Sequence, residues 1–218
     1  MLGFYGGSFD PPHIGHSQCV VNAAKEINLN SVALLPCAQS PLKALTATPQ
    51  QHRLAMLNLV CDDSNKKQKN VTLNLDETEL NLPRPSFTVN TLKHLRKKYG
   101  TNSSLCFLLG EDSLYTLYKW KEWQTITNYC HLVVMRREGN YLRDNIEFNQ
   151  WLNARLIDDV NTLHNTPNGH IYLCNSSLVT ISSSAIRQMI AEQPESARNW
   201  LPESVAKYIF KHTLYTSE

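Results

Sequence analysis

The sequence predicts an α/β fold: a Rossmann-like, doubly wound, mostly parallel sheet of six strands with helices on both faces and a small helical part at the C-terminus. Short apolar segments alternate with longer helix-like segments along most of the 218 residues, which is the pattern of parallel strands joined by right-handed helical crossovers. A chain of this length with 42% hydrophobic residues can bury one full-sized core. We therefore expect a single domain over residues 1–218.

Each element follows from a local signal. The expected strands are the apolar runs 2–5, 32–36, 71–75, 105–109, 132–135 and 171–174. The expected helices are residues 16–27, 49–61, 87–99 and 113–127, followed by 182–191 and 203–212. Gly100 stands where a helix end favours a left-handed residue, and Pro202 stands at a first helical position.

Residues 138–168 interrupt the alternation of strands and helices. They are polar apart from an amphipathic piece around Trp151 and Leu152. We expect an insertion or a small helical excursion there, and the segment indicates no function.

Charge and cysteine content bound the class of partner. The net charge of +2 gives no general reason to expect nucleic acid or a membrane, so any anion site must be local. The six cysteines are scattered singly, which favours buried thiols in a reducing compartment. No apolar stretch approaches the ~20 residues of a membrane span, and a first strand at Leu2 leaves no room for a signal peptide. We expect a cytoplasmic protein.

The most informative segment is residues 6–16, which read GGSFDPPHIGH directly after the first expected strand. Glycines without Cβ let backbone N–H groups approach a phosphate closely, and the first turn of a helix adds roughly half a positive charge. Neither common phosphate loop, G-x-x-x-x-G-K-[ST] or G-x-G-x-x-G, occurs in the chain. The segment therefore predicts a nucleotide site of another type.

Simpler interpretations of this segment stay open. His13 and His16 fit an ordinary helix cap, and with Cys19 they fit, loosely, a three-ligand zinc face. For Asp10 we expect a structural role, an Asx-type bond that shapes the turn before the two prolines.

Ligands of such sheets bind outside the carboxyl ends of the strands, so the residues that follow each strand belong to one crevice. These are residues 36–43, 76–88, 110–112, 136–137 and 181–187, besides the histidine segment. The last of them reads ISSSAIR and opens a helix, where serine hydroxyls and unpaired N–H groups meet Arg187 one turn on. A simple N-cap is the alternative for the serines.

Residues 8–16 resemble the signature of the nucleotidyltransferase superfamily, [ST]-F-D-P-x-H-x-G-H, at every defined position. Residues 181–187 match I-S-[ST]-[ST]-x-I-R, which closes the site in that family, and the leading Gly6-Gly7 pair narrows the resemblance to the nicotinate mononucleotide adenylyltransferases. The resemblance covers residues 2 to about 212, apart from the region near 140–168, and gives residues 182–212 the role of closing the ATP site.

This resemblance implies transfer of the adenylyl group of ATP to nicotinate mononucleotide, giving deamido-NAD and pyrophosphate in NAD biosynthesis. The reaction is a direct in-line attack without a covalent intermediate, and Mg²⁺ arrives on the ATP phosphates. The implied catalytic residues are His16 on the α-phosphate, His13 and Arg187 on the phosphate chain, and Lys43 at the outer phosphates. The residues implied for ATP binding are Gly6, Gly7, Ser8, Phe9, His13, His16, Gly110, Asp112, Ile181, Ser182, Ser184 and Arg187.

The mononucleotide site rests on two further resemblances. Residues 85–92 resemble P-S-Y-T-x-x-T-L, and residues 117–120 resemble L-x-x-W. N–H groups of Phe87 and Thr88 at a free helix start would favour the carboxylate of nicotinate over a neutral amide by several tenths to about 2 kcal/mol. Trp120 would stack on the pyridine ring, and Arg137 would bind the phosphate or carboxylate region.

Two of these assignments have structural alternatives. Trp120 is also a candidate core aromatic, because Trp123 follows at helical spacing. Asp112 is also a candidate N-cap for a helix from Ser113.

The sequence departs from the family pattern in three places. Residues 40–43 read SPLK where P-P-H-K is usual, so only Lys43 remains of that loop. Residues 137–139 read REG in place of R-P-G, and Phe87 replaces the usual Tyr. The alternatives are a phosphopantetheine or nicotinamide mononucleotide adenylyltransferase and a non-catalytic nucleotide sensor, although the phosphopantetheine enzymes are shorter and lack the ISSSAIR closure.

Overall fold

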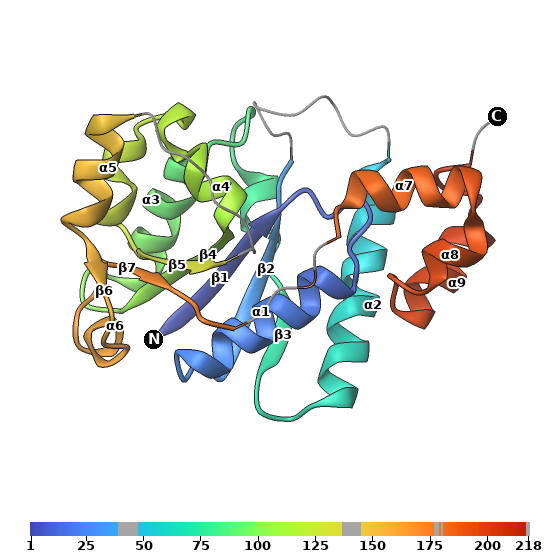
Figure 1. The fold of residues 1–218 in the computed structure, drawn as a ribbon, viewed down its shortest axis with the longest axis horizontal. Helices are drawn as coiled ribbons and strands as arrows, with labels where there is room; N and C mark the ends of the chain where they lie inside the picture. The colour runs from blue at the N-terminus through green and yellow to red at the C-terminus, as the bar shows by residue number, and fades with distance from the viewer. Residues whose placement is uncertain (39–47, 137–144, 177–178, 180, 217–218) are drawn as a thin grey trace.

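A single sheet forms the centre of the molecule (Figure 1). The computed structural model describes residues 1–38, 48–136, 145–176, 179 and 181–216. Within these residues the sheet has seven strands in the order β3-β2-β1-β4-β5-β7-β6, and every neighbouring pair is parallel. The strands are β1 (Leu2–Gly7), β2 (Ser31–Pro36), β3 (Thr72–Leu75), β4 (Leu105–Gly110), β5 (His131–Met135), β6 (Leu156–Ile157) and β7 (Ile171–Leu173). The α/β, doubly wound prediction is confirmed, with seven parallel strands in place of six.

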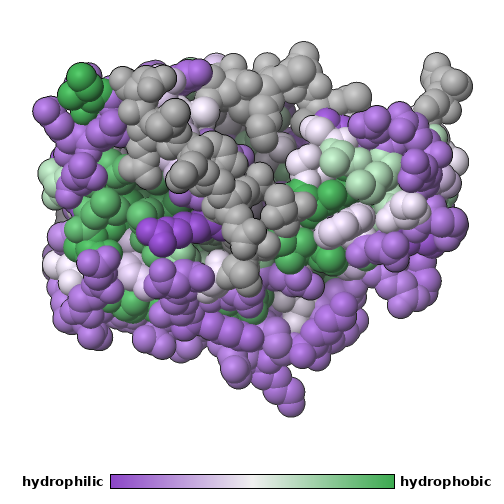
Figure 2. Space-filling view, in the orientation of Figure 1, coloured by the Kyte–Doolittle hydropathy of each residue, from purple (hydrophilic) through white to green (hydrophobic). Residues whose placement is uncertain are grey.

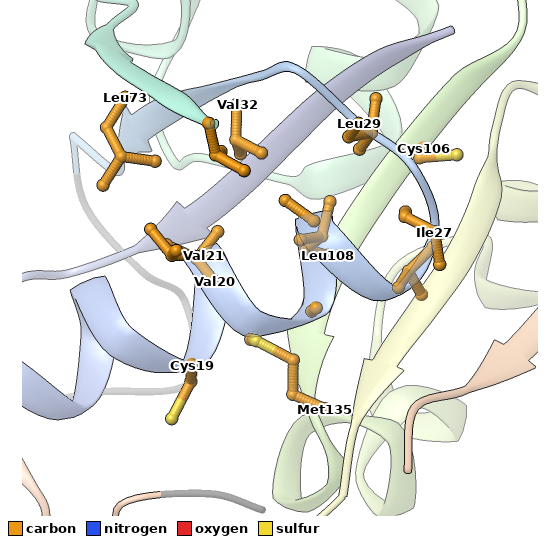
Figure 3. Packing of buried hydrophobic residues seen from close by; sticks show 14 of the residues in the cluster. Cys19, Val20, Val21, Ile27, Leu29, Val32, Leu73, Cys106, Leu108 and Met135 are labelled. Atoms are coloured by element: carbon orange, nitrogen blue, oxygen red, sulfur yellow. The ribbon is translucent and has the colours of Figure 1, made fainter. Parts of the chain in front are cut away.

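Helices cover both faces of the sheet because successive strand residues point to opposite sides. Cys106 and Leu108 of β4 join the core under α1 (Ile14–Glu26), whereas Phe107 and Leu109 join the core on the other face. Figure 3 shows Val20 and Val21 of α1 packed against the strands on the first face. The opposite core contains side chains of α3 (Thr88–Tyr99), α4 (Glu111–Tyr115), η3 (Trp123–Asn128) and α5 (Ile146–Asn153).

The C-terminal helices pack beside the sheet rather than on it. Helix α9 (Glu203–Lys211) packs against α2 (Gln50–Lys67), and α7 (Ser183–Glu192) packs against α8 (Pro194–Arg198); Figure 1 shows this group at the right. Their shared core joins Met56 and Val60 of α2 to Ile186, Ile190, Val205 and Ile209. This third core fixes the position of the ISSSAIR segment.

One expectation about an element was wrong, and the small helical excursion expected at 138–168 gains a strand. The helix expected at 113–127 is divided into α4, η2 (Leu117–Lys119) and η3. Trp120 is extended after η2, and Glu122 has φ 51, a left-handed conformation, before η3. Of the polar stretch 138–168, the described part holds α5, α6 (Asn161–Asn165) and β6, and β6 pairs with β7 at the sheet edge. Two strand residues are too few to leave a period in the sequence.

Smaller predictions fare differently. Gly100 has φ 82 at the end of α3, as the sequence indicates. Pro202 is the N-cap of α9, one residue before its expected place.

The surface that faces the viewer in Figure 1 is mixed in character. Figure 2 shows hydrophilic side chains along its lower rim and hydrophobic ones on each side of the grey atoms. No helix of the described residues has the length and apolar character that crossing a membrane requires.

Candidate active site

The sheet has its topological switch point between β1 and β4. From β1 the chain adds β2 and β3 on one side, and then returns to add β4, β5 and β7 on the other. In parallel α/β sheets such a point opens a crevice at the carboxyl ends of the strands. The segment after β1 carries the histidines, Gly110 ends β4, and Asp112 follows in α4.

Gly6 and Gly7 make room for aromatic rings. A Cβ on Gly6 would lie 2.8 Å from Cζ of Phe107, and one on Gly7 would lie 2.9 Å from Cζ of Phe9. Phe9 itself is 1% exposed and has φ 49, a strained conformation for a bulky residue. The glycines therefore let the chain turn sharply over a buried ring, and the Asp10–Pro11 peptide that follows is cis.

The two histidines form one unit at the start of α1. His13 is the N-cap residue, and its backbone N–H donates to Nδ1 of His16 at 3.2 Å. The two rings stack with centroids 3.6 Å apart. An Nδ1 that accepts a hydrogen bond carries no proton, so neutral His16 holds its proton on Nε2 and can donate it to an anion.

The two simpler interpretations of these histidines have different outcomes. The cap interpretation is correct, because the backbone N–H of the N-cap residue His13 donates to the His16 ring. The same hydrogen bond orients His16 as a donor. For zinc, no group of three His, Cys, Asp or Glu side chains that could hold a metal forms among the described residues, and His13, His16 and Cys19 are among them.

Side chains from distant elements hold the oxygens of the loop. Arg53 Nη1 donates to the carbonyl of Ser8 at 2.8 Å, and Arg187 Nη1 donates to the carbonyl of Asp10 at 2.6 Å. Ser183 Oγ donates to the carbonyl of Pro11 at 2.9 Å. Three carbonyls within four residues of the loop are therefore anchored by side chains of α2 and α7.

Asp10 is structural, but not in the way expected. Its Oδ1 accepts a hydrogen bond from the hydroxyl of Tyr215 at 2.6 Å. The Asx-type bond that we expected is absent from the hydrogen bonds of the described residues, and a contact across 205 positions takes its place.

The start of α7 lies against the start of α1. A Cβ on Gly15 would lie 2.9 Å from Nδ1 of His13 and 3.1 Å from Cγ2 of Ile181. Ser182 accepts from the backbone N–H of Ala185 at 3.1 Å, which confirms its N-cap alternative. Ser184 Oγ accepts from Nη2 of Arg187 at 3.1 Å. The histidine segment and the serine segment thus meet, as the sequence predicts.

Gly110 and Asp112 lie at the start of α4. The helix begins at Glu111, so the interpretation of Asp112 as the cap of a helix from Ser113 is wrong. A Cβ on Gly110 would lie 2.5 Å from Oδ1 of Asp112. The absence of that Cβ lets the carboxylate lie against the backbone in the first helical turn, where the dipole favours it.

The residues expected to bind the mononucleotide, here called the proposed acceptor region, centre on the start of α3. Phe87 is the N-cap residue, the helix has no side-chain cap, and no acidic residue stands in its first turn. Lys121 Nζ lies 4.7 Å from the centre of the Phe87 ring, so the segment with Trp120 reaches this helix start, close to Thr88. Trp120 and Trp123 both pack against the same core, which supports the core alternative for Trp120, although the divided helix removes the regular spacing between them.

Two expected site residues fall outside the described part of the chain, and three others were missed. Lys43 and its loop 40–43, together with Arg137, have no described position. Arg53, Lys121 and Tyr215 were not predicted. Arg53 gave one usable signal, a cation among the apolar positions of a predicted helix; it is 2% exposed, and its Nε has no hydrogen-bond partner among the residues described.

This fold and this meeting of chain segments define the nucleotidyltransferase class of α/β proteins. Residues 4–189 match the family model described as cytidylyltransferase-like. A "probable nicotinate-nucleotide adenylyltransferase" of Pseudoalteromonas atlantica is 39% identical over 98% of this chain and 94% of its own length. A protein of the same name from Pectobacterium atrosepticum is 36% identical over 99% and 98%. The chain therefore belongs to the cytidylyltransferase-like family and, within it, to the nicotinate-nucleotide adenylyltransferases.

Solved structures share the fold. The nicotinic acid mononucleotide adenylyltransferase of Plasmodium falciparum, complexed with NaAD, superposes with a TM-score of 0.68 at 21% identity, covering 98% of this chain and 96% of that one. The same enzyme complexed with APC has a TM-score of 0.68 at 19% identity and the same coverage.

Proposed function

We propose that this protein transfers the adenylyl group of ATP to nicotinate mononucleotide, forming deamido-NAD and pyrophosphate in NAD biosynthesis. Membership of the family over nearly the full length supports this activity. The single structural observation that carries it is the meeting of the histidine segment and the start of α7 at the switch point. A cytoplasmic location stays a prediction from cysteine usage.

ATP binds across this meeting point. Nε2–H of His16 donates to the α-phosphate, and His13 and Arg187 act on the phosphate chain. Among the described residues Arg187 uses one Nη1 and one Nη2 proton, and since a guanidinium has five N–H donors, the others can bind phosphate oxygens. The hydroxyls of Ser182 and Ser184 lie at the same helix start.

The nucleoside occupies the glycine side of the crevice. The backbone from Gly6 to Phe9 contacts the adenine, with Ile181 beside the ring. Gly110 and Asp112 contact the ribose, since a carboxylate is a suitable acceptor for its hydroxyls.

Charge, and not an acid–base pair, drives the chemistry. A phosphate monoester has a second pKa near 6, so nicotinate mononucleotide is already a dianionic nucleophile at neutral pH. The enzyme has to hold two polyanions together with the α-phosphorus in line for attack, and fixed donors stabilise the charge that develops as pyrophosphate leaves. No covalent intermediate forms.

The acceptor binds at the start of α3. Backbone N–H groups of Phe87 and Thr88 favour the nicotinate carboxylate through the helix dipole, and Trp120 stacks on the pyridine ring. Lys121, close to Phe87, adds a cation that the sequence did not predict there. Lys43 and Arg137 keep their proposed roles at the outer phosphates and at the mononucleotide.

Magnesium enters as part of the substrate. We assign Mg²⁺ to the phosphates of ATP, whose oxygens and water suit its octahedral preference. No step is routed through a metal bound by the protein.

Pyrophosphate release with different acceptors tests this function. We expect release with ATP, Mg²⁺ and nicotinate mononucleotide, and a kcat/KM several-fold to about 30-fold lower with nicotinamide mononucleotide. Equal kcat/KM values would contradict the role of the α3 start. Preference for phosphopantetheine would indicate the other adenylyltransferase, and no release with any acceptor would indicate a nucleotide sensor.

A further inference from the structure

The chain after α9 returns to the nucleotide loop in a strained conformation. Backbone N–H groups of Thr213 and Leu214 donate to Phe210 and Ile209, which closes the helix end, but this geometry normally uses glycine. Thr213 has φ 47 and Tyr215 has φ 64, and a β-branched residue is unfavourable there. Such strain persists only where surrounding contacts hold it, and it clusters at functional sites.

Tyr215 supplies the contact that holds it. Its hydroxyl donates to Oδ1 of Asp10 at 2.6 Å, and Asp10 is 4% exposed. Burial and the neighbouring carboxylate of Asp10 raise the pKa of Tyr215, so the hydroxyl keeps its proton as a donor. Thr48, just before α2, also hydrogen-bonds to Tyr215.

Asp10 depends on this hydroxyl. Among the described residues no other donor to its carboxylate is found, and no Lys, Arg or His nitrogen lies within 4.0 Å of it. A buried carboxylate that loses its donor is strongly disfavoured and turns toward water. The backbone of the loop between Phe9 and His13 would have to follow.

We propose that Tyr215 is a positioning residue for ATP: through Asp10 it fixes the turn that presents the loop backbone and the His13–His16 pair to the nucleotide. The proposal rests on the proposed function of that loop. Tyr215 acts from a distant part of the chain, and its hydrogen bonds reach Asp10 and Thr48 but no described residue of the proposed acceptor region. Its effect therefore belongs to ATP and not to nicotinate mononucleotide.

The substitution Tyr215→Phe tests this role, with Tyr208→Phe as the matched control. Tyr208 also lies in the C-terminal part, and its hydroxyl pairs with Nδ1 of His52 at 2.9 Å, away from the loop. For Tyr215→Phe we expect kcat/KM for ATP to fall about 10- to 100-fold, the range for loss of a hydrogen bond to a charged group, while KM for nicotinate mononucleotide stays within about twofold. For Tyr208→Phe both constants stay within about twofold. An equal rise of both KM values in Tyr215→Phe, or unchanged kinetics, would overturn the proposal.

A double-mutant cycle with Asp10 tests whether the hydroxyl acts through this carboxylate. Tyr215→Phe added to Asp10→Ala should cost almost nothing further, because the two groups form one interaction. Asp10→Asn, which keeps an oxygen acceptor, should lose less activity than Asp10→Ala and serves if the alanine variant fails to fold. Losses that multiply independently would contradict the proposal.

An ATP-binding measurement separates this proposal from the proposed function. If the wild-type protein released no pyrophosphate with any acceptor, the function would fail, but calorimetric binding of a non-hydrolysable ATP analogue would still test Tyr215. We expect Tyr215→Phe to weaken that binding about tenfold or more and Tyr208→Phe to leave it within about twofold. Equal affinities for both variants and the wild type would overturn the role of Tyr215.

Discussion

A substitution at Gly15 affects the stability of α1 and the geometry of the histidines in different ways. It lies in the first turn of the helix, where alanine is more favourable than glycine by about 1 kcal/mol. A Cβ there would lie 2.9 Å from Nδ1 of His13, which is closer than ordinary packing allows, so the buried imidazole has to move.

We predict that Gly15→Ala lowers kcat by about tenfold or more while the melting temperature changes by only a few degrees, because the gain in helix propensity offsets the crowding. Steady-state kinetics and thermal unfolding of the same preparation measure both. A kcat within about twofold of the wild type would show that the position of His13 is not critical.

Single residues were predictable where the sequence neighbourhood sets their geometry. His13 and His16 are three positions apart, so their place in one helical turn follows from the sequence alone. The partners of Asp10 and Ser8 lie 205 and 45 positions away, and only the tertiary packing of α2 and of the C-terminal segment brings them to the loop. No local pattern encodes Tyr215 or the contact of Arg53.

At the scale of elements, a buried carboxyl joins α3 to the segment before it. Glu79 in η1 (Thr78–Asn81) accepts from Thr91 Oγ1 of α3 at 3.2 Å, and it also hydrogen-bonds to Ser86. Loss of hydration on burial raises the pKa of Glu79 to about 7 from its ordinary 4.5. Ser86 in turn accepts from the N–H of Ala38 at 3.1 Å, which ties the end of β2 to the acceptor region.

The raised pKa makes a prediction about pH. The folded state keeps the Glu79 proton between pH 4.5 and 7 while the unfolded state has lost it, so the contribution of Glu79 to stability falls as the pH rises through that window. We expect Glu79→Gln to gain roughly 2–3 kcal/mol relative to the wild type from pH 4.5 to 7 and to level off above 7.

Chemical unfolding of both proteins at several pH values measures this difference. Taking the difference matters, because buried His131 has its pKa lowered to about 4 by loss of hydration and gives the opposite slope between pH 4 and 6.5 in both proteins. A constant difference across the window would mean that Glu79 titrates normally in the folded state.

Elements with long periodic patterns were predictable, and short or broken ones were not. The six strands that the sequence indicated are all present; five are apolar runs, and the strand at 71–75 alternates apolar and polar residues. β6 has two residues, and the break at Glu122 comes from one backbone angle at a residue that favours helices, so neither leaves a signal. Tertiary pairing with β7 decides the first, and tertiary packing overrides propensity in the second.

Across the whole molecule, the carboxyl ends and the amino ends of the strands have different roles. The proposed site lies at the carboxyl ends of the strands, whereas Arg96 of α3 gathers the segments that enter the amino ends. Its guanidinium donates to the carbonyls of Gly100, Thr101, Ser103, Tyr129 and Pro167 at 2.6–3.3 Å. These residues precede β4, β5 and β7.

We predict that Arg96→Met destabilises the protein by about 3 kcal/mol, because several carbonyls lose a charged donor at once, while kcat stays within about twofold. Lys207→Ala, in an exposed ion pair with Glu203, should change the stability by less than about 0.5 kcal/mol. Urea unfolding and kinetics well below the melting temperature measure the two effects. A kcat that fell together with the stability would show that the contacts at the amino ends of the strands affect the site at their carboxyl ends.

The central claim is that fixed donors at the switch point, foremost Nε2 of His16, stabilise the charge that develops at the α-phosphate. The most direct test is the kcat of pyrophosphate release by His16→Ala with saturating ATP, Mg²⁺ and nicotinate mononucleotide, alongside a thermal unfolding curve. We predict a kcat at least about 100-fold below the wild type, by analogy with the loss of one oxyanion donor, in a protein destabilised by only about 1 kcal/mol through the lost cap bond. A folded variant with near-normal kcat would contradict the account.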